Sequence, residues 1–278
     1  MKALAPEFGL APACRALGVP RSTASRKSAS RPRPDLAPLK QAVLALRVTH
    51  RLYGVKRMAA LLATLGAAPS RRELRRAYLE LGILGKPRRK KAPATTDSRH
   101  GQRRYPNLVK GVKAERADQV WAADVTCVRA QGKWLFLALV MDVATRFVVG
   151  WALGASNDTA LTLQALRKGF ALGRSPEVHH SDHGGNYAAR EYVGLLEARG
   201  IQVSMAKKGE PRENAYAERL NRTVKDEEAR AARYAGQAHA EAGLKEYLEY
   251  YNALRLHTSL GCKTPSQTRE ALTREDAQ

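Results

Sequence analysis

The chain has 278 residues, of which 44% are hydrophobic, and this is long and apolar enough for two domains with a sizeable core. No stretch approaches the roughly 18 apolar residues of a membrane span, and the first residues lack the long apolar run of a signal peptide. The three cysteines have neither zinc-ligand nor disulfide spacing. Secreted, membrane and zinc-finger proteins are therefore disfavoured, and we expect a reducing, cytoplasmic environment.

Positive charge is concentrated at the start of the chain. Residues 1–113 hold 26 basic and 5 acidic side chains, and the remaining residues hold 22 and 21, so nearly all of the formal net charge of +22 precedes residue 114. An unneutralised field of this size destabilises a compact protein, which predicts a polyanionic partner. Nucleic acid is the leading candidate, because each neutralised phosphate releases counterions. A ribosome-like or merely soluble basic surface is the alternative.

Residues 1–85 are predicted to form a helical DNA-binding region. Two short helical stretches meet at Gly18-Val19-Pro20, and the second begins with polar and basic residues that include Arg21 and Arg26. A tight turn before such a helix is typical of a helix-turn-helix. Apolar residues at helical spacing predict a further helix over Leu36–Thr49.

A second unit of this kind is expected around residue 70. Ser70 can cap a helix over Arg71–Leu81. The helix carries four basic residues, which either contact DNA or form a solvated face: Arg71, Arg72, Arg75 and Arg76. Residues 86–113 then have the composition of a basic linker that lies along a phosphate backbone. Its basic run contains Arg88, Arg89, Lys90 and Lys91.

Residues 114–278 alternate strands and helices. The predicted strands are Gln119–Arg129, Trp134–Val143, Arg146–Leu153, Glu177–Ser181 and Ile201–Met205. The predicted helices run from Asp158 to Phe170, from Arg190 to Arg199, and from about Asn214 to Ala231. Three consecutive strands followed by strand–helix alternation predict an α/β fold, an RNase-H-like mixed five-stranded sheet with flanking helices.

Three acidic residues stand out by their positions. Asp124 lies inside the first strand, Asp182 ends the fourth strand just before Gly184, and Glu218 lies in the last predicted helix. An acid among apolar neighbours is costly to bury unless it is paired or binds a metal. Converging oxygen ligands suit Mg²⁺ or Mn²⁺, and two such ions can activate a nucleophile and stabilise a leaving oxygen in phosphoryl transfer. Taken singly, each acid can equally be an ordinary surface residue.

The flanks of these acids resemble a known family. Trp121 precedes Asp124, the string His180-Ser181-Asp182-His183-Gly184 continues to Tyr187, and thirty-five residues separate Asp182 from Glu218. Lys225 follows Glu218 by seven positions, and a closing string runs from Tyr251-Asn252 through Arg255 and His257 to Thr264-Pro265. Roughly residues 10–270 resemble the OrfB-type transposases of the insertion-sequence-3 family, which have a retroviral-integrase-like catalytic core. Two positions depart from the family pattern: Glu213 replaces an aspartate, and His183 stands where arginine is common.

The resemblance implies a DNA transposase that binds the ends of its mobile element. It implies that Asp124, Asp182 and Glu218 are the catalytic metal ligands for Mg²⁺ or Mn²⁺, with two ions when DNA is bound. It also implies a bacterial, nucleoid-associated protein that acts as a homo-oligomer on double-stranded DNA, both terminal repeats and target. An upstream-frame OrfA-type partner is a further possibility. The predicted division is residues 1–85 for DNA binding, 86–113 as linker and 114–278 as catalytic core with C-terminal helices.

Further polar residues surround Glu218. Seven positions are close to two helical turns, so Lys225 shares a face with Glu218 and is expected to contact a DNA phosphate. Asn214 and Arg222 lie four positions before and after Glu218, and either contact DNA or reflect helix-surface polarity. His179 and His180 can be metal ligands, although strand packing is favoured, and His257 either contacts DNA or caps a turn. The role of His183 is left open.

Two other functions fit parts of the pattern. One is a non-catalytic DNA-binding regulator of transposition with a structural RNase-H-like domain, which the acids at all three positions disfavour. The other is an RNase H-type hydrolase of RNA–DNA hybrids. The Glu218–Lys225 spacing and the closing string tie the resemblance to DNA joining instead.

Overall fold

A five-stranded mixed sheet forms the centre of the computed structural model, which describes residues 9–21, 34–84, 103–207 and 210–275. The strands lie in the order β3-β2-β1-β4-β5, where β1 to β3 form an antiparallel meander and β4 and β5 add in parallel. This confirms the predicted fold class. Their bounds are β1 (Val120–Ala130), β2 (Lys133–Asp142), β3 (Val148–Gly154), β4 (Val178–Ser181) and β5 (Gln202–Met205).

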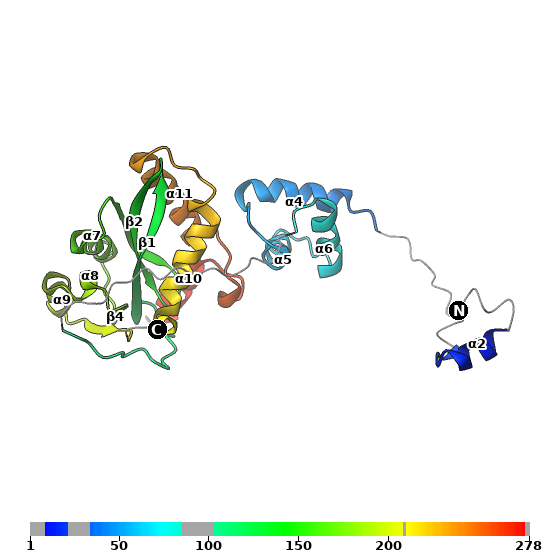
Figure 1. Ribbon diagram of the computed structural model, residues 1–278, viewed down its shortest axis with the longest axis horizontal. Coiled ribbons are helices and arrows are strands. Elements are labelled where there is room, and N and C mark those ends of the chain that lie inside the picture. Colours follow the sequence, from blue (N-terminus) through cyan, green and yellow to red (C-terminus); the bar gives the residue numbers. More distant parts are fainter. Residues whose placement is uncertain (1–8, 22–33, 85–102, 208–209, 276–278) are drawn as a thin grey trace.

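Helices cover both faces of the sheet (Figure 1). On one face α7 (Thr159–Phe170), α8 (Gly185–Ala188) and α9 (Arg190–Glu197) pack over Trp121 and Ala123 of β1. On the other face α10 (Ala215–Val224) and α11 (Gln237–Ala253) pack over Val120 and Ala122. Because side chains alternate along a strand, β1 supplies both cores and is buried through most of its length.

Two glycines allow α7 to approach the sheet closely. A Cβ on Gly150 of β3 would lie 2.1 Å from the carbonyl oxygen of Ala165, and one on Gly169 of α7 would lie 2.9 Å from the Trp121 ring. No side chain fits at either position without moving the helix. The close packing of α7 on β3 and on the Trp121 ring therefore depends on these glycines.

The helix that carries Glu218 differs from the single long helix predicted over residues 214–231. A 3₁₀ turn, η1 (Pro211–Asn214), precedes α10, and a π-helical turn, η2 (Lys225–Ala229), follows it. Helix-forming composition continues through this region, so periodicity alone gives no sign of the changes in winding. The chain ends with η3 (Thr258–Leu260) and α12 (Pro265–Glu275).

The N-terminal part contains α2 (Leu10–Ala16), α4 (Ala37–Thr49), α5 (Val55–Thr64) and α6 (Arg71–Glu80). The second helix of the predicted helix-turn-helix, after Arg21, lies outside the described residues. Ser70 caps α6 as predicted, since its hydroxyl accepts from the Glu73 amide while the Glu73 carboxylate accepts from the Ser70 amide. Helices α4 to α6 share a core of their own, which includes Val43, Met58 and Leu74.

These three helices dock on η2, the segment that follows α10. Arg57 of α5 lies 3.4 Å from the Glu227 carboxylate in η2, and Tyr53 donates to the Leu254 carbonyl while accepting from the Leu256 amide. Glu227 also accepts from Arg255 at 2.6 and 2.7 Å. The helical unit is thus bonded to the turn immediately after α10, and Figure 1 shows the two side by side.

Residues 103–113, which belong to the predicted linker, pack on the sheet edge. The Met205 amide of β5 donates to the Pro106 carbonyl, and the Leu108 amide donates to the Ser204 hydroxyl. The earlier part of that linker, with Arg88, Arg89, Lys90 and Lys91, lies outside the described ranges. No helix in the described part of the chain has both the length and the apolar character to cross a membrane. All three cysteines are free thiols.

Candidate active site

Asp124 and Asp182 lie side by side because their strands are parallel neighbours. The β1–β4 register pairs Ala123 with Ser181, so the next residue of each strand is one of the two acids. Strand β4 ends at Ser181, whereas β1 continues, and this places the Asp182 carboxylate at an open edge of the sheet. Both aspartates are half-buried.

Local hydrogen bonds fix the orientation of each aspartate. One Asp124 oxygen accepts from the Val125 amide at 2.8 Å, and the other accepts from the Asn221 side chain at 2.8 Å. Asp182 accepts from the Gly184 amide at 3.1 Å. A Cβ on Gly184 would lie 3.0 Å from the same carboxylate oxygen, so a glycine allows this close turn. Glu218 is exposed on α10.

The three carboxylates influence one another electrostatically. Burial, followed by the negative charges of Asp182 and Glu218, raises the pKa of Asp124 to about 8. The pKa of Glu218 is also raised, by desolvation and by Asp182, against the opposing charge of Arg222. Within the described residues no three His, Cys, Asp or Glu side chains stand close enough together to hold an ion. The three carboxylates therefore interact electrostatically but are too far apart in this structure to bind one ion together.

Asn221 belongs to this site but was missed from sequence. It lies one helical turn after Glu218, its side chain is buried, and it bonds directly to Asp124. The available signal was an amide among the apolar residues of α10, between Leu220 and Val224. A buried polar residue on an apolar helix face requires a partner, and here that partner is the predicted metal ligand.

The residues around Glu218 have different environments. Lys225 is half-buried, and burial lowers its pKa while Cys127 and Asp124 raise it, which places its ammonium group beside β1. Arg222 is exposed. Asn214 is buried, and its amide donates to the Ala123 carbonyl at 3.0 Å. The 3₁₀ turn that ends at Asn214 directs it towards the sheet rather than onto the surface with Glu218, so its predicted DNA contact gains no support.

The predicted DNA-binding arginines of the first part differ in exposure. Arg71, Arg72 and Arg75 are exposed along α6, whereas Arg76 donates to the Pro34 carbonyl and pairs with Glu80. Arg21 is exposed at the end of its described segment, and Arg26 lies outside it. The exposed arginines of α6 thus remain suitable for phosphate contacts.

The histidines near Asp182 are packed in the interior. His179 accepts from or donates to the Tyr192 hydroxyl at 3.0 Å, and burial lowers its pKa to about 3, so it is neutral. His180 bonds to the Ser204 hydroxyl at 2.9 Å and to the Glu213 carbonyl at 3.1 Å. His183 is buried. His257 packs edge-on against Tyr251 and contacts Arg255. These contacts match the favoured packing interpretation for His179 and His180.

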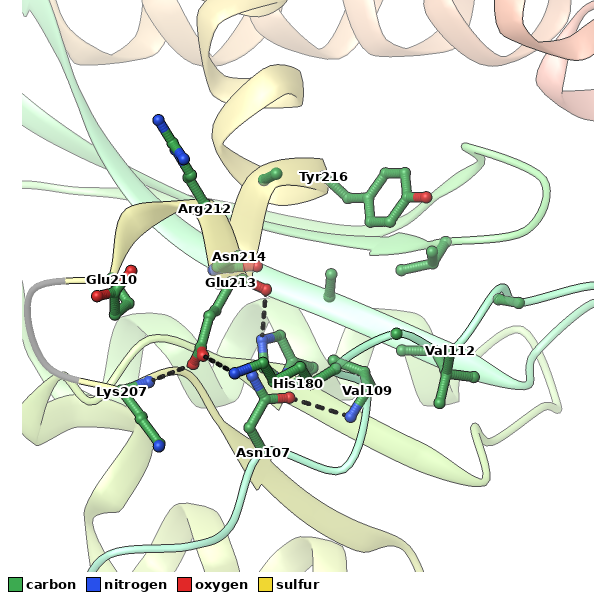
Figure 2. A pocket seen from close by; sticks show the side chains of 17 residues that line it. Asn107, Val109, Val112, His180, Lys207, Glu210, Arg212, Glu213, Asn214 and Tyr216 are labelled. Carbon is green, nitrogen blue, oxygen red and sulfur yellow. Dashed lines mark hydrogen bonds and ion pairs between the residues drawn. The ribbon is translucent and has the colours of Figure 1, made fainter.

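A cavity of about 530 Å³ lies under the start of α10 (Figure 2). None of the three predicted ligands lines it; its walls include Val112, His180 and Asn214. Glu213, the residue that departs from the family pattern, accepts from the Lys207 amide at 2.8 Å. The longer acid thus anchors the turn before the catalytic helix.

The clustered charges predict a pH-dependent stability of the metal-free protein. Because the pKa of Asp124 rises from an ordinary 3.8 to about 8 on folding, the folded state binds more protons, and stability falls as pH rises from about 4 to 8. Asp124→Asn removes this penalty. We expect denaturant unfolding in EDTA to show a gain of about 2 kcal/mol at pH 8, reduced from the full shift by solvent access, and less at pH 5. Equal stabilities at pH 8 would contradict the charge cluster.

The sheet order and the paired acids at its open edge define the class of ribonuclease-H-like integrase cores. Family models described as "Integrase core domain" match residues 114–211 and 199–265. A chain from the simian T-cell lymphotropic virus intasome, solved with PP2A regulatory subunit B56 gamma, superposes with a TM-score of 0.50 at 19% identity. The match covers 81% of this chain and 73% of that one, and it shows the fold alone.

Two curated relatives extend the match over most of the chain. The insertion element IS600 uncharacterized 31 kDa protein of Shigella sonnei is 37% identical over 226 residues, which are 80% of this chain and 83% of that protein. The transposase InsF for insertion sequence IS3A of Escherichia coli (strain K12) is 27% identical over 271 residues, 94% of each. The chain belongs to the insertion-sequence-3 family of DNA transposases, which have an integrase-like polynucleotidyl transferase core.

Proposed function

We propose that this transposase cuts and joins DNA at its element ends with Asp124, Asp182 and Glu218 as ligands of two Mg²⁺ or Mn²⁺ ions. The observation that carries the proposal is the parallel pairing of β1 with β4, which places Asp124 beside Asp182 at the end of β4. Burial and the other two carboxylates also raise the pKa of Asp124. Like charges gathered at one place without a neutralising partner destabilise the protein, and a divalent cation would remove that cost.

The donor set fits such ions. The three proposed ligands offer only carboxylate oxygens, which suit hard cations better than imidazole or thiolate do. His179 and His180 are already bonded to Tyr192 and Ser204, and therefore do not compete as ligands. When bound, the ions would activate the attacking oxygen and stabilise the leaving oxygen.

The chain's own residues position the reactants. Asn221 and the Val125 amide hold Asp124 in one orientation, and the Gly184 amide holds Asp182. Lys225 lies close enough to Asp124 for their charges to interact, and there it can bind a phosphate oxygen next to the scissile bond. A 3′-hydroxyl then displaces the leaving 3′-oxygen from the phosphodiester, and no bond to the protein forms.

A direct assay tests this function. The full chain is incubated with a duplex that carries the terminal repeats flanking its gene, with Mg²⁺ or with EDTA, and the strands are resolved on a denaturing gel. We expect nicked and joined strands only with the divalent cation. Products that form equally in EDTA would refute the metal-dependent chemistry, and no products under either condition would refute cleavage by the chain alone.

Helix α6 supplies the phosphate contacts of the first part in this proposal. Changing Arg71, Arg72 and Arg75 together to glutamine in the full chain should weaken duplex binding. Each lost phosphate contact should reduce the slope of log K against log salt by about 0.9. The matched control is Arg190→Gln on α9, which is also exposed and should leave the slope unchanged. Equal slopes for the triple variant and the wild type would exclude α6 from the interface.

The proposal extends to assembly. Joining two element ends requires two scissile phosphates, and one active site holds only one at a time, so at least two chains meet on the DNA. An OrfA-type partner from the upstream reading frame remains part of this proposal, as does association with the bacterial nucleoid.

A further inference from the structure

The β1–β2 hairpin projects well beyond the strand that ends at Asp182. Strand β4 pairs with β1 only from Val120 to Ala123, and the pairing of β3 with β2 ends at Phe136. Beyond these limits β1 and β2 continue as a hairpin arm to the turn at Gln131-Gly132, as Figure 1 shows. One side of the arm packs on the core, and near its end the Gln131 amide donates to the Tyr234 carbonyl. This arm starts at the active site and leads away from it.

A tryptophan and two cations lie at the end of the arm. Trp134 is 60% exposed, and its cross-strand partner is Arg129. The Arg129 guanidinium lies 5.6 Å from the centre of the Trp134 ring. Arg129 and Lys133 are exposed, and neither forms an ion pair with another residue in the described part of the chain.

The positive charge of the arm indicates which class of partner it binds. No acidic residue occurs between Val125 and Ala138, so no side chain of the hairpin itself neutralises the two cations. An aromatic ring beside unpaired cations is the arrangement by which proteins bind unpaired nucleic-acid strands, with bases stacked on the ring and phosphates at the cations. A protein partner would need acidic groups to match these cations.

The arm is connected to the active site along β1. The arm begins at Asp124, and Arg129 follows five residues later. Between them, Cys127 lies close enough to Lys225 to interact with it electrostatically. At the rise of an extended strand, five residues span about 17 Å, which equals about five steps of stacked DNA at 3.4 Å each. A strand that leaves the scissile phosphate past Lys225 would therefore reach the Trp134 ring after about five nucleotides.

We propose that Trp134, Arg129 and Lys133 form a DNA-strand site that stacks an unpaired base about five nucleotides from the scissile phosphate. The proposal rests on the function proposed above and adds a place where the end of the duplex is held open. Trp134 binds the base, and the two cations bind the flanking phosphates.

Fluorescence titration of the full chain in EDTA tests this site without cleavage. The probes are a duplex with five unpaired nucleotides at one end and a blunt duplex of the same sequence. We expect the forked probe to quench tryptophan emission mainly at Trp134, which is exposed, whereas Trp121 is fully buried and Trp151 is half-buried. Trp134→Ala should weaken forked-probe binding by roughly 5- to 150-fold and blunt-probe binding far less. Trp134→Phe should retain most of the affinity and lose the quenching.

A matched control distinguishes base stacking on Trp134 from a general loss of exposed apolar surface. Leu172→Ala removes another exposed apolar side chain, which is 50% exposed, and should change neither affinity nor quenching. Unchanged forked-probe affinity in Trp134→Ala would overturn the proposal, as would quenching that persists in Trp134→Phe. A Trp134→Ala protein that binds DNA as the wild type does but sediments as a smaller species would also overturn the proposal. Trp134 would then lie in a contact between two copies of the chain. If the wild-type chain does not cleave DNA in the Mg²⁺ assay, the proposed function is refuted. That outcome is independent of the binding results in EDTA.

Discussion

Asp124→Asn should abolish strand cleavage and joining while leaving DNA binding nearly intact. The amide keeps the size of the carboxylate and can still bond to Asn221, but it removes a charge that the proposed site would need, with Asp182 and Glu218, to hold a divalent cation. We expect a loss of at least about a thousandfold in single-turnover cleavage rate, because the ions supply both nucleophile activation and leaving-group stabilisation. Gel-shift affinity for the same duplex should be close to that of the wild type.

A matched control keeps this result specific. Glu241→Gln also removes one negative charge, at an exposed position on α11, and should cleave at the wild-type rate. Because Asp124→Asn is expected to stabilise the metal-free fold, unfolding cannot account for its inactivity. Normal cleavage by the Asp124→Asn protein would remove Asp124 from the catalytic site.

The largest expected loss of stability comes from Glu227→Ala. Its carboxylate binds the buried Arg255 through two hydrogen bonds, accepts from the Tyr247 hydroxyl at 3.1 Å, and pairs with Arg57. Removing it leaves the Arg255 cation buried without its counter-charge, which costs about 3–5 kcal/mol. Denaturant unfolding should show this loss as a lower midpoint.

Two variants test the cause of that loss. Replacing Glu227 with leucine and Arg255 with methionine together should recover most of the stability, because no unpaired charge then remains. Glu115→Ala breaks the exposed ion pair with Lys113 and should cost less than about 1 kcal/mol. If Glu227→Ala lowers the free energy of unfolding by less than about 1 kcal/mol, the Arg255 charge is stabilised by other groups. The Glu227–Arg255 pair is then not the main contact that stabilises this region.

The fold could be predicted from the sequence because it depends on local patterns, and the same patterns single out the three acids proposed as metal ligands. The apolar runs over β1, β2 and β3 give strand length and order, and Ser70 with Glu73 gives the start of α6. The acids Asp124, Asp182 and Glu218 stand out because each interrupts or ends an apolar element. The approach of the two aspartates follows from the parallel pairing of β1 with β4.

The contacts that could not be predicted join residues far apart in the chain. The bond from Asn221 to Asp124 spans 97 positions, and the pairing of Arg57 with Glu227 spans 170. Local patterns do not indicate that Asp142, at the end of β2, is fully buried, or that Arg269 of α12 bonds to Asp118. Tertiary packing decides which polar residues meet, and no local periodicity records it.

The π-helical turn after α10 makes the length of this segment as important as its composition. A π turn accommodates one more residue than an α turn, and each residue of a helix rotates the next by about 100°. Deleting one residue between Lys225 and Ala229 would let the turn rewind as α-helix and would turn Glu227 away from Arg57 and Arg255. The number of residues in this segment therefore sets how the N-terminal helices are oriented relative to α10. Insertions and deletions here should be tolerated far less than substitutions.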